Sequence, residues 1–319
     1  MTKVLAILCT LFFAACQNAS GPSIDEGNST NADSLTKPLV YKPPYQVATG
    51  KVNVPSIPDS IYFCGNLVPL QFQDIRERLD QELVIMANWH SRTLLCLKRA
   101  KRLFPEIEKE LAKNNVPDDF KYLAVIESGL DNVVSPMGAA GIWQIMKATA
   151  KENGLIVTSS IDERYHFAKA TKVACKYLKK AYDKLKSWEL AAAAYNMGTN
   201  GIAKKVKEQR QNNYFKLYLN SETRRYLFRI IAAKILFENA DKYGFEMGED
   251  DYYPAYEYIT DSLYERKINW IDYAIDYGGD YYTLKLHNPW IRSTSTKFRS
   301  KHSFVINWPK ELQHINSAN

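Results

Sequence analysis

Two neighbouring stretches, AVIESGL at residues 124–130 and SPMGAAGIWQIM at residues 135–146, carry the main indication of fold and site. The first predicts an apolar helix that ends at Gly129, with Glu127 as its last charged residue. A carboxyl among apolar neighbours loses hydration, which raises its pKa. Since a general acid that works near neutral pH needs a raised pKa, Glu127 is a candidate acid.

The second stretch predicts a tight loop beside that helix. Gly138 and Gly141 flank it and would let the backbone approach a ligand closely. Trp143 offers a flat apolar surface and Gln144 an amide that both donates and accepts, which together suit an N-acetyl sugar. The alternative is a surface glutamate at a helix end beside a structural glycine turn. Taken alone, the two stretches are more typical of that alternative.

The surrounding sequence, residues 71–237, has helical periodicity. Residues 167–185 show it best, with apolar side chains on one face and lysines on the rest. Further helices are expected from Asp118, which could cap its first turn, over residues 188–197, and from Ser221 onward. Strand signals are scarce here. We therefore predict a mainly α protein with a lysozyme-like, all-α catalytic domain.

The amino-acid composition changes after residue 244, where tyrosine and aspartate become frequent. Short β-rich segments at 256–260 and 303–308 enclose a helical stretch at 270–286, which predicts a small α+β module over residues 246–319. The module loosely resembles a LysM glycan-binding repeat, but it lacks the usual Gly-Asp-Thr opening. The alternative is a packing or interaction module.

Composition and charge narrow the class of protein. Of 319 residues, 46% are hydrophobic and 24% charged, as in ordinary globular proteins. The net charge of +7 is spread along the helices, so no nucleic-acid-binding stripe is indicated. An anionic envelope polymer or lipid surface suits this modest excess. The five histidines show no zinc spacing, and we expect no metal.

The N-terminal residues predict export. Lys3 precedes an apolar run at residues 4–15, which is too short to cross a bilayer and is typical of a secretory signal. Phe-Ala-Ala before Cys16 resembles a bacterial lipobox, so residues 1–16 are predicted to be a lipoprotein signal with Cys16 lipidated. A plain secretory signal is the alternative. Residues 17–45 are polar and rich in Asn, Ser and Pro, and we predict a flexible tether.

Three cysteines would remain after processing, namely Cys64, Cys96 and Cys175. They form neither a disulfide scaffold nor a common metal spacing. One pair could bridge in an oxidising compartment. Buried small apolar residues are the simpler interpretation.

Four blocks in order carry a family resemblance: Glu127-Ser128-Gly129, residues 138–144, residues 194–198 (AYNMG), and Glu222-Thr223 with Tyr226. Together they resemble the catalytic domain of lytic transglycosylases of the soluble-lytic-transglycosylase type, which share the goose-type lysozyme fold. The resemblance runs over residues 57–245, and we place the domain at residues 46–245. In one departure, Lys147 stands where the family commonly has proline.

The resemblance implies a role for each matched residue. Glu127 would be the catalytic acid/base. The implied substrate-binding residues are Ser128, Ser135, Gln144, Met146, Tyr195, Asn196, Glu222 and Tyr226. Structural alternatives stay open for three of them: Tyr195 could be a core aromatic, Asn196 a helix cap, and Glu222 a complement to a helix N-terminus.

The resemblance also implies the reaction. The enzyme would cleave the β-1,4 bond between MurNAc and GlcNAc in peptidoglycan, leave 1,6-anhydro-MurNAc ends, and need no cofactor. We expect a monomer that contacts glycan strands and reaches the membrane through its lipid, facing the periplasm from the outer membrane. Two alternatives remain, a hydrolysing muramidase on the same fold and a catalytically silent wall-binding lipoprotein.

Overall fold

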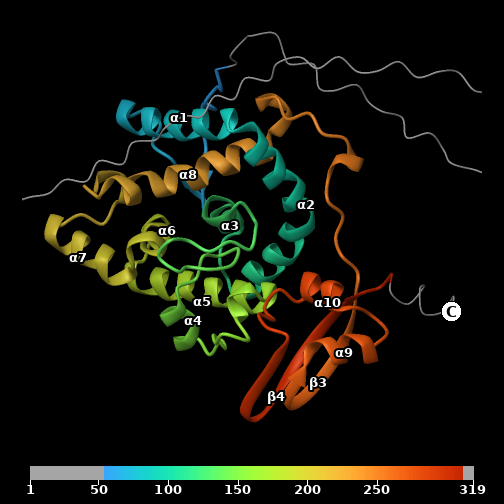
Figure 1. Ribbon diagram of the computed structural model, residues 1–319. Helices are drawn as coiled ribbons and strands as arrows, with labels where there is room; N and C mark the ends of the chain where they lie inside the picture. The colour runs from blue at the N-terminus through green and yellow to red at the C-terminus, as the bar shows by residue number, and fades with distance from the viewer. Residues whose placement is uncertain (1–53, 312–319) are drawn as a thin grey trace, which may run out of the picture. The chain divides into compact units, whose positions relative to one another are not determined.

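The computed structural model describes residues 54–311 of the chain. The predicted signal, the lipidated Cys16 and the tether at residues 17–45 lie outside the described residues. Within them, helices predominate up to residue 243 and a small α+β module follows, as the sequence predicts (Figure 1). The helices of the larger part are α1 (Gln73–Asn88), α2 (His90–Lys113), α3 (Lys121–Ser128), α4 (Lys147–Glu152), α5 (Phe167–Leu185), α6 (Trp188–Met197), α7 (Thr199–Gln209) and α8 (Ser221–Glu238).

Helix α3 lies at the centre of this part, with α1 and α8 above it, α2 to its right and α5 and α6 below and to its left in Figure 1. Because neighbours cover it on nearly all sides, the helix is apolar almost all round. Its residues 122–126 are all buried. Glu127, only half-buried, is the exception in its last turn. The fold thus holds one carboxyl at the end of a central apolar helix.

Three predicted helices have the bounds that their sequence patterns indicate. Helix α5 spans Phe167–Leu185 and buries its apolar face. Helix α6 spans Trp188–Met197, and the run of four alanines at its centre is fully buried, so neighbouring helices can approach closely. Helix α8 begins at Ser221, where the Asn220 side chain accepts a hydrogen bond from the Thr223 N–H at 2.8 Å.

The predicted start of the central helix is wrong in detail. Asp118–Phe120 form a short 3₁₀ turn, and α3 begins only at Lys121. The Asp118 side chain does not cap a backbone N–H but pairs with Lys121 at 2.6 Å. A two-residue hairpin, β1 (Tyr62–Phe63) with β2 (Asn66–Leu67), was also missed, since such short strands leave no periodic pattern. Lys147 is the first residue of α4, a position where proline is favoured, so its departure from the family pattern is harmless.

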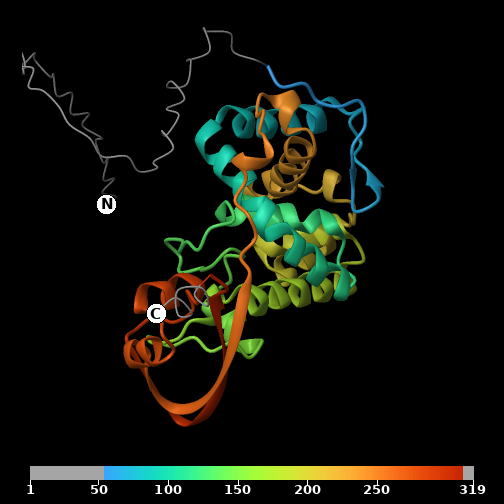
Figure 2. The ribbon, with the colours of Figure 1, turned by 90° about the vertical axis from the view of Figure 1, so that its right-hand side faces the viewer.

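The C-terminal module is one antiparallel strand pair with two short helices. Strands β3 (Tyr258–Asn269) and β4 (Ser295–Pro309) are both longer than predicted. The predicted single helix is two, α9 (Trp270–Asp276) and α10 (Tyr281–His287), because Gly278 takes a left-handed φ of +85° between them. Figure 2 shows the long curved strand pair and the helices packed beside it.

The module shares a hydrophobic core with the larger part. Ala140, Ile161 and Tyr165 of the larger part cluster with Trp290 and Ile291 of the module. Backbone hydrogen bonds cross the same junction, from the Asp162 N–H to the Trp290 carbonyl and from the Arg292 N–H to the Ser160 carbonyl, both at 2.8 Å. The junction therefore lies directly behind the loop that contains Ala140.

The three cysteines among residues 54–311 are free thiols. Cys96 and Cys175 are buried, as expected for small apolar residues, whereas Cys64 is half-buried. No disulfide links any two of these three residues.

Candidate active site

Glu127 owes its position to the way α3 ends. Gly129 takes a left-handed φ of +68° and its N–H bonds the Val125 carbonyl at 2.9 Å, which stops the helix two residues after the carboxyl. A Cβ at position 129 would lie 3.2 Å from the Cys96 sulfur, so glycine also fits the space. Glu127 is thereby held at the end of the helix rather than within it.

Burial and a hydrogen bond from a tyrosine change the pKa of the Glu127 carboxyl in opposite directions. Loss of hydration raises its pKa, and this is the largest effect. Tyr226 on α8, itself almost fully buried, donates a hydrogen bond from its hydroxyl to Glu127 Oε1, which partly offsets the rise. Sequence reasoning named both residues, and the structure brings them into contact.

Arg229 and Glu222, also on α8, add opposite charges near Glu127. Arg229 lowers the pKa of Glu127 and Glu222 raises it. One guanidinium nitrogen of Arg229 lies 3.1 Å from Glu222 Oε1, and another donates to the Ile126 carbonyl at 3.0 Å. Arg229 was not predicted. Its spacing of three residues from Tyr226 and seven from Glu222 places it on their helical face, and this signal could have found it.

Tyr195 and Asn196 are at the end of α6, and Tyr195 lies close to the same carboxyl. Burial and then the charge of Glu127 raise the pKa of Tyr195, while its hydroxyl donates to the Trp143 carbonyl at 2.8 Å. Asn196 accepts a hydrogen bond from the Thr223 hydroxyl at 2.6 Å, which ties α6 to α8. Asn196 is also exposed, so part of its side chain remains open to solvent.

Ser128 is the last residue of α3, and Ser135 lies within the loop that follows it. The Ser128 hydroxyl is buried, donates to the Ile142 carbonyl at 2.8 Å and accepts from the Asp131 N–H at 3.3 Å. It holds the loop against α3 and is not presented for substrate binding. Ser135 is half-buried and accepts from the Ala139 N–H at 3.1 Å, which closes the loop's turn and leaves its own O–H free to donate.

Two sequence predictions about this loop are wrong. Trp143 is fully buried and its indole N–H donates to Thr171 at 2.9 Å, so it is not a surface for a sugar. At Gly141 the close approach is to protein rather than to a ligand, because an added Cβ would lie 2.1 Å from the Arg164 carbonyl oxygen. An apolar aromatic in a glycine-rich loop can face either way, and here the core contact prevails.

Arg164 supports the loop from behind and was also missed. Its guanidinium pairs with Asp162 at 2.7 Å and donates to the carbonyls of Gly138 at 2.7 Å and Ile145 at 3.2 Å. These bonds fix both sides of the loop against the segment that meets the C-terminal module. Nothing local in the sequence distinguishes this arginine from the others.

Four predicted residues line one pocket of about 250 Å³ between α5, α6 and the loop. They are Gln144, Met146, Tyr195 and Asn196. Gln144 uses its amide N–H groups on the Val133 and Gly141 carbonyls, so the amide oxygen stays available to accept. Met146 is 45% exposed and supplies an apolar wall. We call this hollow the α6 pocket.

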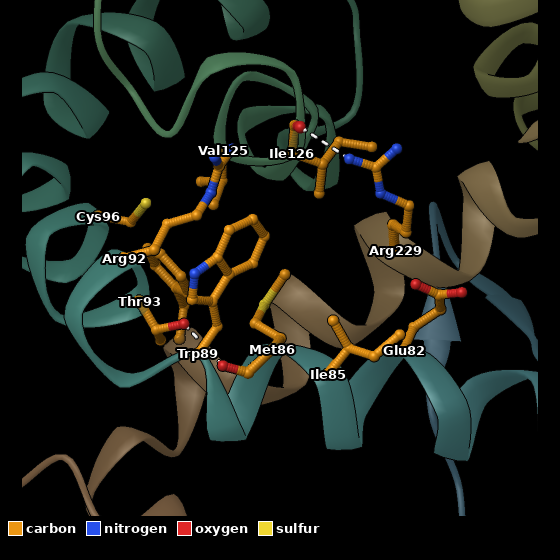
Figure 3. Close-up of a pocket in the computed structure, with 11 residues that line it drawn as sticks. Glu82, Ile85, Met86, Trp89, Arg92, Thr93, Cys96, Val125, Ile126 and Arg229 are labelled. Atoms are coloured by element: carbon orange, nitrogen blue, oxygen red, sulfur yellow. Dashed lines mark hydrogen bonds between the residues drawn. The ribbon is translucent and has the colours of Figure 1, made fainter. Parts of the chain in front are cut away.

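A smaller pocket of about 70 Å³ lies where α1 and α2 meet, opposite α3 and α8 (Figure 3). Its walls include Met86, Trp89, Arg92, Ile126 and Arg229. Sequence reasoning named none of these as site residues. We call it the Trp89 pocket. Within residues 54–311, no group of three or more His, Cys, Asp or Glu side chains is arranged to hold a metal.

The fold thus places a half-buried carboxyl at the end of a central helix, with a tyrosine that donates to it. Residues 104–218 match the family described as the transglycosylase SLT domain. Residues 262–312 match the family described as the soluble lytic transglycosylase C-terminal LysM-like domain. The predicted fold class is thus confirmed, and so is the LysM likeness of the module.

The chain is homologous to membrane-bound lytic murein transglycosylase D of Escherichia coli K12, at 30% identity over 185 residues. The protein of the same name from E. coli O6:H1 matches equally. The aligned region is 56% of this chain but only 40% of the relative, so the chain spans less than half the length of the curated relatives. Among the described residues, no helix combines the length and apolarity needed to cross a membrane.

Proposed function

We propose that the chain is a lytic transglycosylase that cleaves the MurNAc-β-1,4-GlcNAc bond of peptidoglycan, with Glu127 as acid and then base. The carrying observation is the position of this one half-buried carboxyl, which accepts a hydrogen bond from the Tyr226 hydroxyl and lies close to Tyr195 of the α6 pocket, within residues that match an SLT domain. Burial raises its pKa. A carboxyl that stays protonated nearer neutral pH can donate to a leaving oxygen.

The surroundings of Glu127 favour a mechanism that uses one carboxylate. Ordinary glycosidases use two, the second as nucleophile or as base for water. Glu222 is the acidic side chain that influences Glu127, but it is 60% exposed and paired with Arg229. It is therefore poorly placed as a nucleophile. A group of the substrate itself has to supply the second function.

The proposed steps balance without water. Glu127 gives its proton to the glycosidic oxygen as the bond from that oxygen to MurNAc C1 breaks, and the N-acetyl oxygen of the substrate stabilises the cationic C1. Glu127, now a carboxylate, takes the proton of the C6 hydroxyl as its oxygen bonds C1. The product is a 1,6-anhydro-MurNAc end, and Glu127 is protonated again.

Tyr226 and Arg229 have their largest effect on the intermediate state. Once Glu127 is a carboxylate, the Tyr226 hydroxyl donates to it and the Arg229 charge stabilises it. Gln144, Met146, Tyr195 and Asn196 are proposed to hold sugar in the α6 pocket, and Ser135 to donate from the loop. Ser128 and Glu222 are proposed to act indirectly, through the loop and through Arg229.

Digestion of purified murein sacculi by protein lacking residues 1–16, with mass spectrometry of the products, tests the proposal. We expect muropeptides lighter by one water than their hydrolysed counterparts, and none with Glu127→Gln. Products with free reducing ends would establish a hydrolytic muramidase instead. No release from a verified substrate would favour the silent binding protein.

The proposal includes anchorage and wall binding. Cys16 is proposed to be lipidated after cleavage of the signal, with residues 17–45 as tether to a monomeric domain at 46–245 on the periplasmic face of the outer membrane. Cys16→Ser should move the protein from the membrane to the soluble fraction.

The LysM-like module is proposed to bind glycan, and unchanged murein retention after deletion of residues 255–319 would contradict this.

A further inference from the structure

The Trp89 pocket is separate from the α6 pocket but also adjoins Glu127. Arg229 lines it and simultaneously influences the Glu127 carboxyl, and Ile126 on its wall is the residue before Glu127. Figure 3 shows Trp89 and Met86 pointing into the space from the α1 side, with Arg229 across from them. The two pockets therefore approach the reacting carboxyl from different elements, α5 and α6 on one side and α1, α2 and α8 on the other.

Arg92 is the unusual residue of this pocket. Its guanidinium carbon lies 4.7 Å from the centroid of the Trp89 ring, which is 53% exposed, and it reaches toward Gly129 at the end of α3. Within residues 54–311 it has no ion pair and no hydrogen-bond acceptor. Arg99, two turns further along α2, is fully engaged by contrast, with Asp131 at 2.7 Å and the Gly129 carbonyl at 3.1 Å.

The remaining charges leave the pocket cationic. Glu82 on its wall is already neutralised by Arg225, at 2.5 and 3.1 Å. Arg229 adds positive charge to the wall, because its partner Glu222 is 60% exposed and solvent weakens that ion pair. Apart from Thr93, whose hydroxyl donates to the Met86 carbonyl, the rest of the wall is apolar and includes Ile85 and Val125. An anion with an apolar stem matches these features.

Size narrows the ligand further. The volume of about 70 Å³ is roughly twice the share of one water molecule in liquid water, so a sugar ring does not fit. A carboxylate on a short alkyl stem does. In peptidoglycan strands that carry peptides, the MurNAc lactyl carboxyl is tied up as an amide, and such carboxylates belong to the acidic peptide that branches from it.

We infer that the Trp89 pocket binds a carboxylate of the peptide branch next to the scissile bond, with Arg92 as the anion ligand and Trp89 as the apolar wall. This inference rests on the proposed function. It makes cleavage of peptide-bearing strands depend on the charge of the branch, because the ion pair forms only with an ionised carboxylate. A guanidinium already stacked on an indole ring loses little freedom when it binds a carboxylate.

The test compares two substrates that differ only in charge. Peptide-bearing glycan strands are used either untreated or with their peptide carboxylates converted to amides by carbodiimide and ammonia. We expect kcat/KM of the native protein to fall about tenfold or more on amidation, the size of one charge-assisted hydrogen bond. Arg92→Gln should cleave both substrates at the lower rate and show no effect of amidation. In a double-mutant cycle, this loss of discrimination reports the contact itself.

Two further variants keep the test decisive. Arg92→Lys retains the charge and should keep a preference for untreated strands, which guards against a folding defect in Arg92→Gln. Arg76→Gln removes an exposed arginine of α1 and should behave as the native protein. Equal losses by Arg92→Gln on both substrates, or unchanged discrimination, would overturn the inference. Failure of the proposed function is a different result, in which the native protein forms no anhydro ends from either substrate.

Discussion

The protonation of Glu127 depends on neighbouring side chains whose effects have opposite signs. The Tyr226 hydrogen bond and the Arg229 charge both lower its pKa, and the Glu222 charge raises it. Tyr226→Phe should therefore raise the pKa of Glu127, and Glu222→Gln should lower it. Since the reaction starts from the protonated acid, the alkaline limb of kcat/KM against pH should move to higher pH in the first variant and to lower pH in the second.

A pH profile separates these effects from mere loss of activity. Tyr226→Phe is also expected to reduce the maximal rate about 10-fold or more, because the carboxylate intermediate loses a charge-assisted donor. Met137→Leu provides a control, because Met137 is 80% exposed in the loop that follows α3. The alkaline limb of its pH profile should not move. Shifts of both variants in the same direction would contradict the assignment of signs.

Glu127 also predicts a cost in stability that has a definite pH dependence. Its pKa is raised in the folded protein above the ordinary value of 4.5, so ionisation favours the unfolded chain. The contribution of protonated Glu127 to stability is fully present below about pH 4.5 and is lost as pH rises through the pKa of the folded state. Glu127→Gln keeps an acceptor for Tyr226 and removes the charge. Its Tm should exceed that of the native protein at pH 7, with the difference vanishing toward pH 4; a lower Tm at pH 7 would contradict this.

At the scale of elements, the loop at residues 129–146 depends on one glycine much more than on another. Gly138 and Gly141 have nearly equal φ values, +81° and +78°, so both lose conformational ease on substitution. Only at Gly141 would a Cβ meet backbone, the Arg164 carbonyl oxygen at 2.1 Å, whereas at Gly138 it meets open space. Gly138→Ala should cost about 1 kcal/mol and Gly141→Ala about 2–5 kcal/mol in the free energy of unfolding.

Urea unfolding of the two variants, with activity measured in parallel, checks this difference. Gly138→Ala is the matched control for the backbone effect. Gly141→Ala should also lower the activity of the protein that remains folded, because the loop positions Gln144 and Met146 in the α6 pocket. Similar costs for both variants would mean that the segment at Arg164 moves aside freely.

The helices could be predicted from sequence because their information is local. Apolar spacing alone delimits residues 167–185, and a terminal glycine ends residues 188–197. The face of a loop residue is not local information, and the burial of Trp143 against Thr171 depends on a contact across 28 residues. The arginine contacts are longer still, since Arg229 meets the Ile126 carbonyl across 103 residues. The resemblance named residues of the site that meet, such as Glu127 and Tyr226, and did not name others around it, such as Arg92 and Arg229.

At the scale of the whole molecule, the sequence predicts a small C-terminal module, and the structure adds that this module has a core in common with the catalytic part. The change in composition near residue 244 marks a change from helices to strands. It carries no information on how the module packs against the catalytic part. The apolar residues Ile161 and Ile291, which form an antiparallel bridge across the junction, are 130 positions apart, and either would be unremarkable alone.

This junction predicts that residues 54–311 unfold in a single transition. Trp290 is 2% exposed, stacks on His166 of the catalytic part at 5.9 Å between ring centroids, and packs on Phe304 of the module at 5.4 Å. Trp290→Ala should destabilise the fold by about 3–5 kcal/mol, the usual cost of removing a buried aromatic side chain. Because Asp162 bonds the Trp290 carbonyl and pairs with Arg164 behind the loop, the loss should reach the active site as well.

Calorimetry with activity measured after each heating step tests the coupling. We expect one unfolding transition in the native protein, with activity lost at the same temperature. Trp290→Ala should lower the unfolding temperature and the temperature of inactivation together. Tyr264→Ala, at a residue of β3 that is 62% exposed, should move neither. Two transitions, with Trp290→Ala lowering only one that leaves activity intact, would mean that the module is merely tethered. A coupled result would mean that the element proposed to hold the glycan also keeps the catalytic loop in place, because Arg164 and Asp162 connect the two through direct bonds.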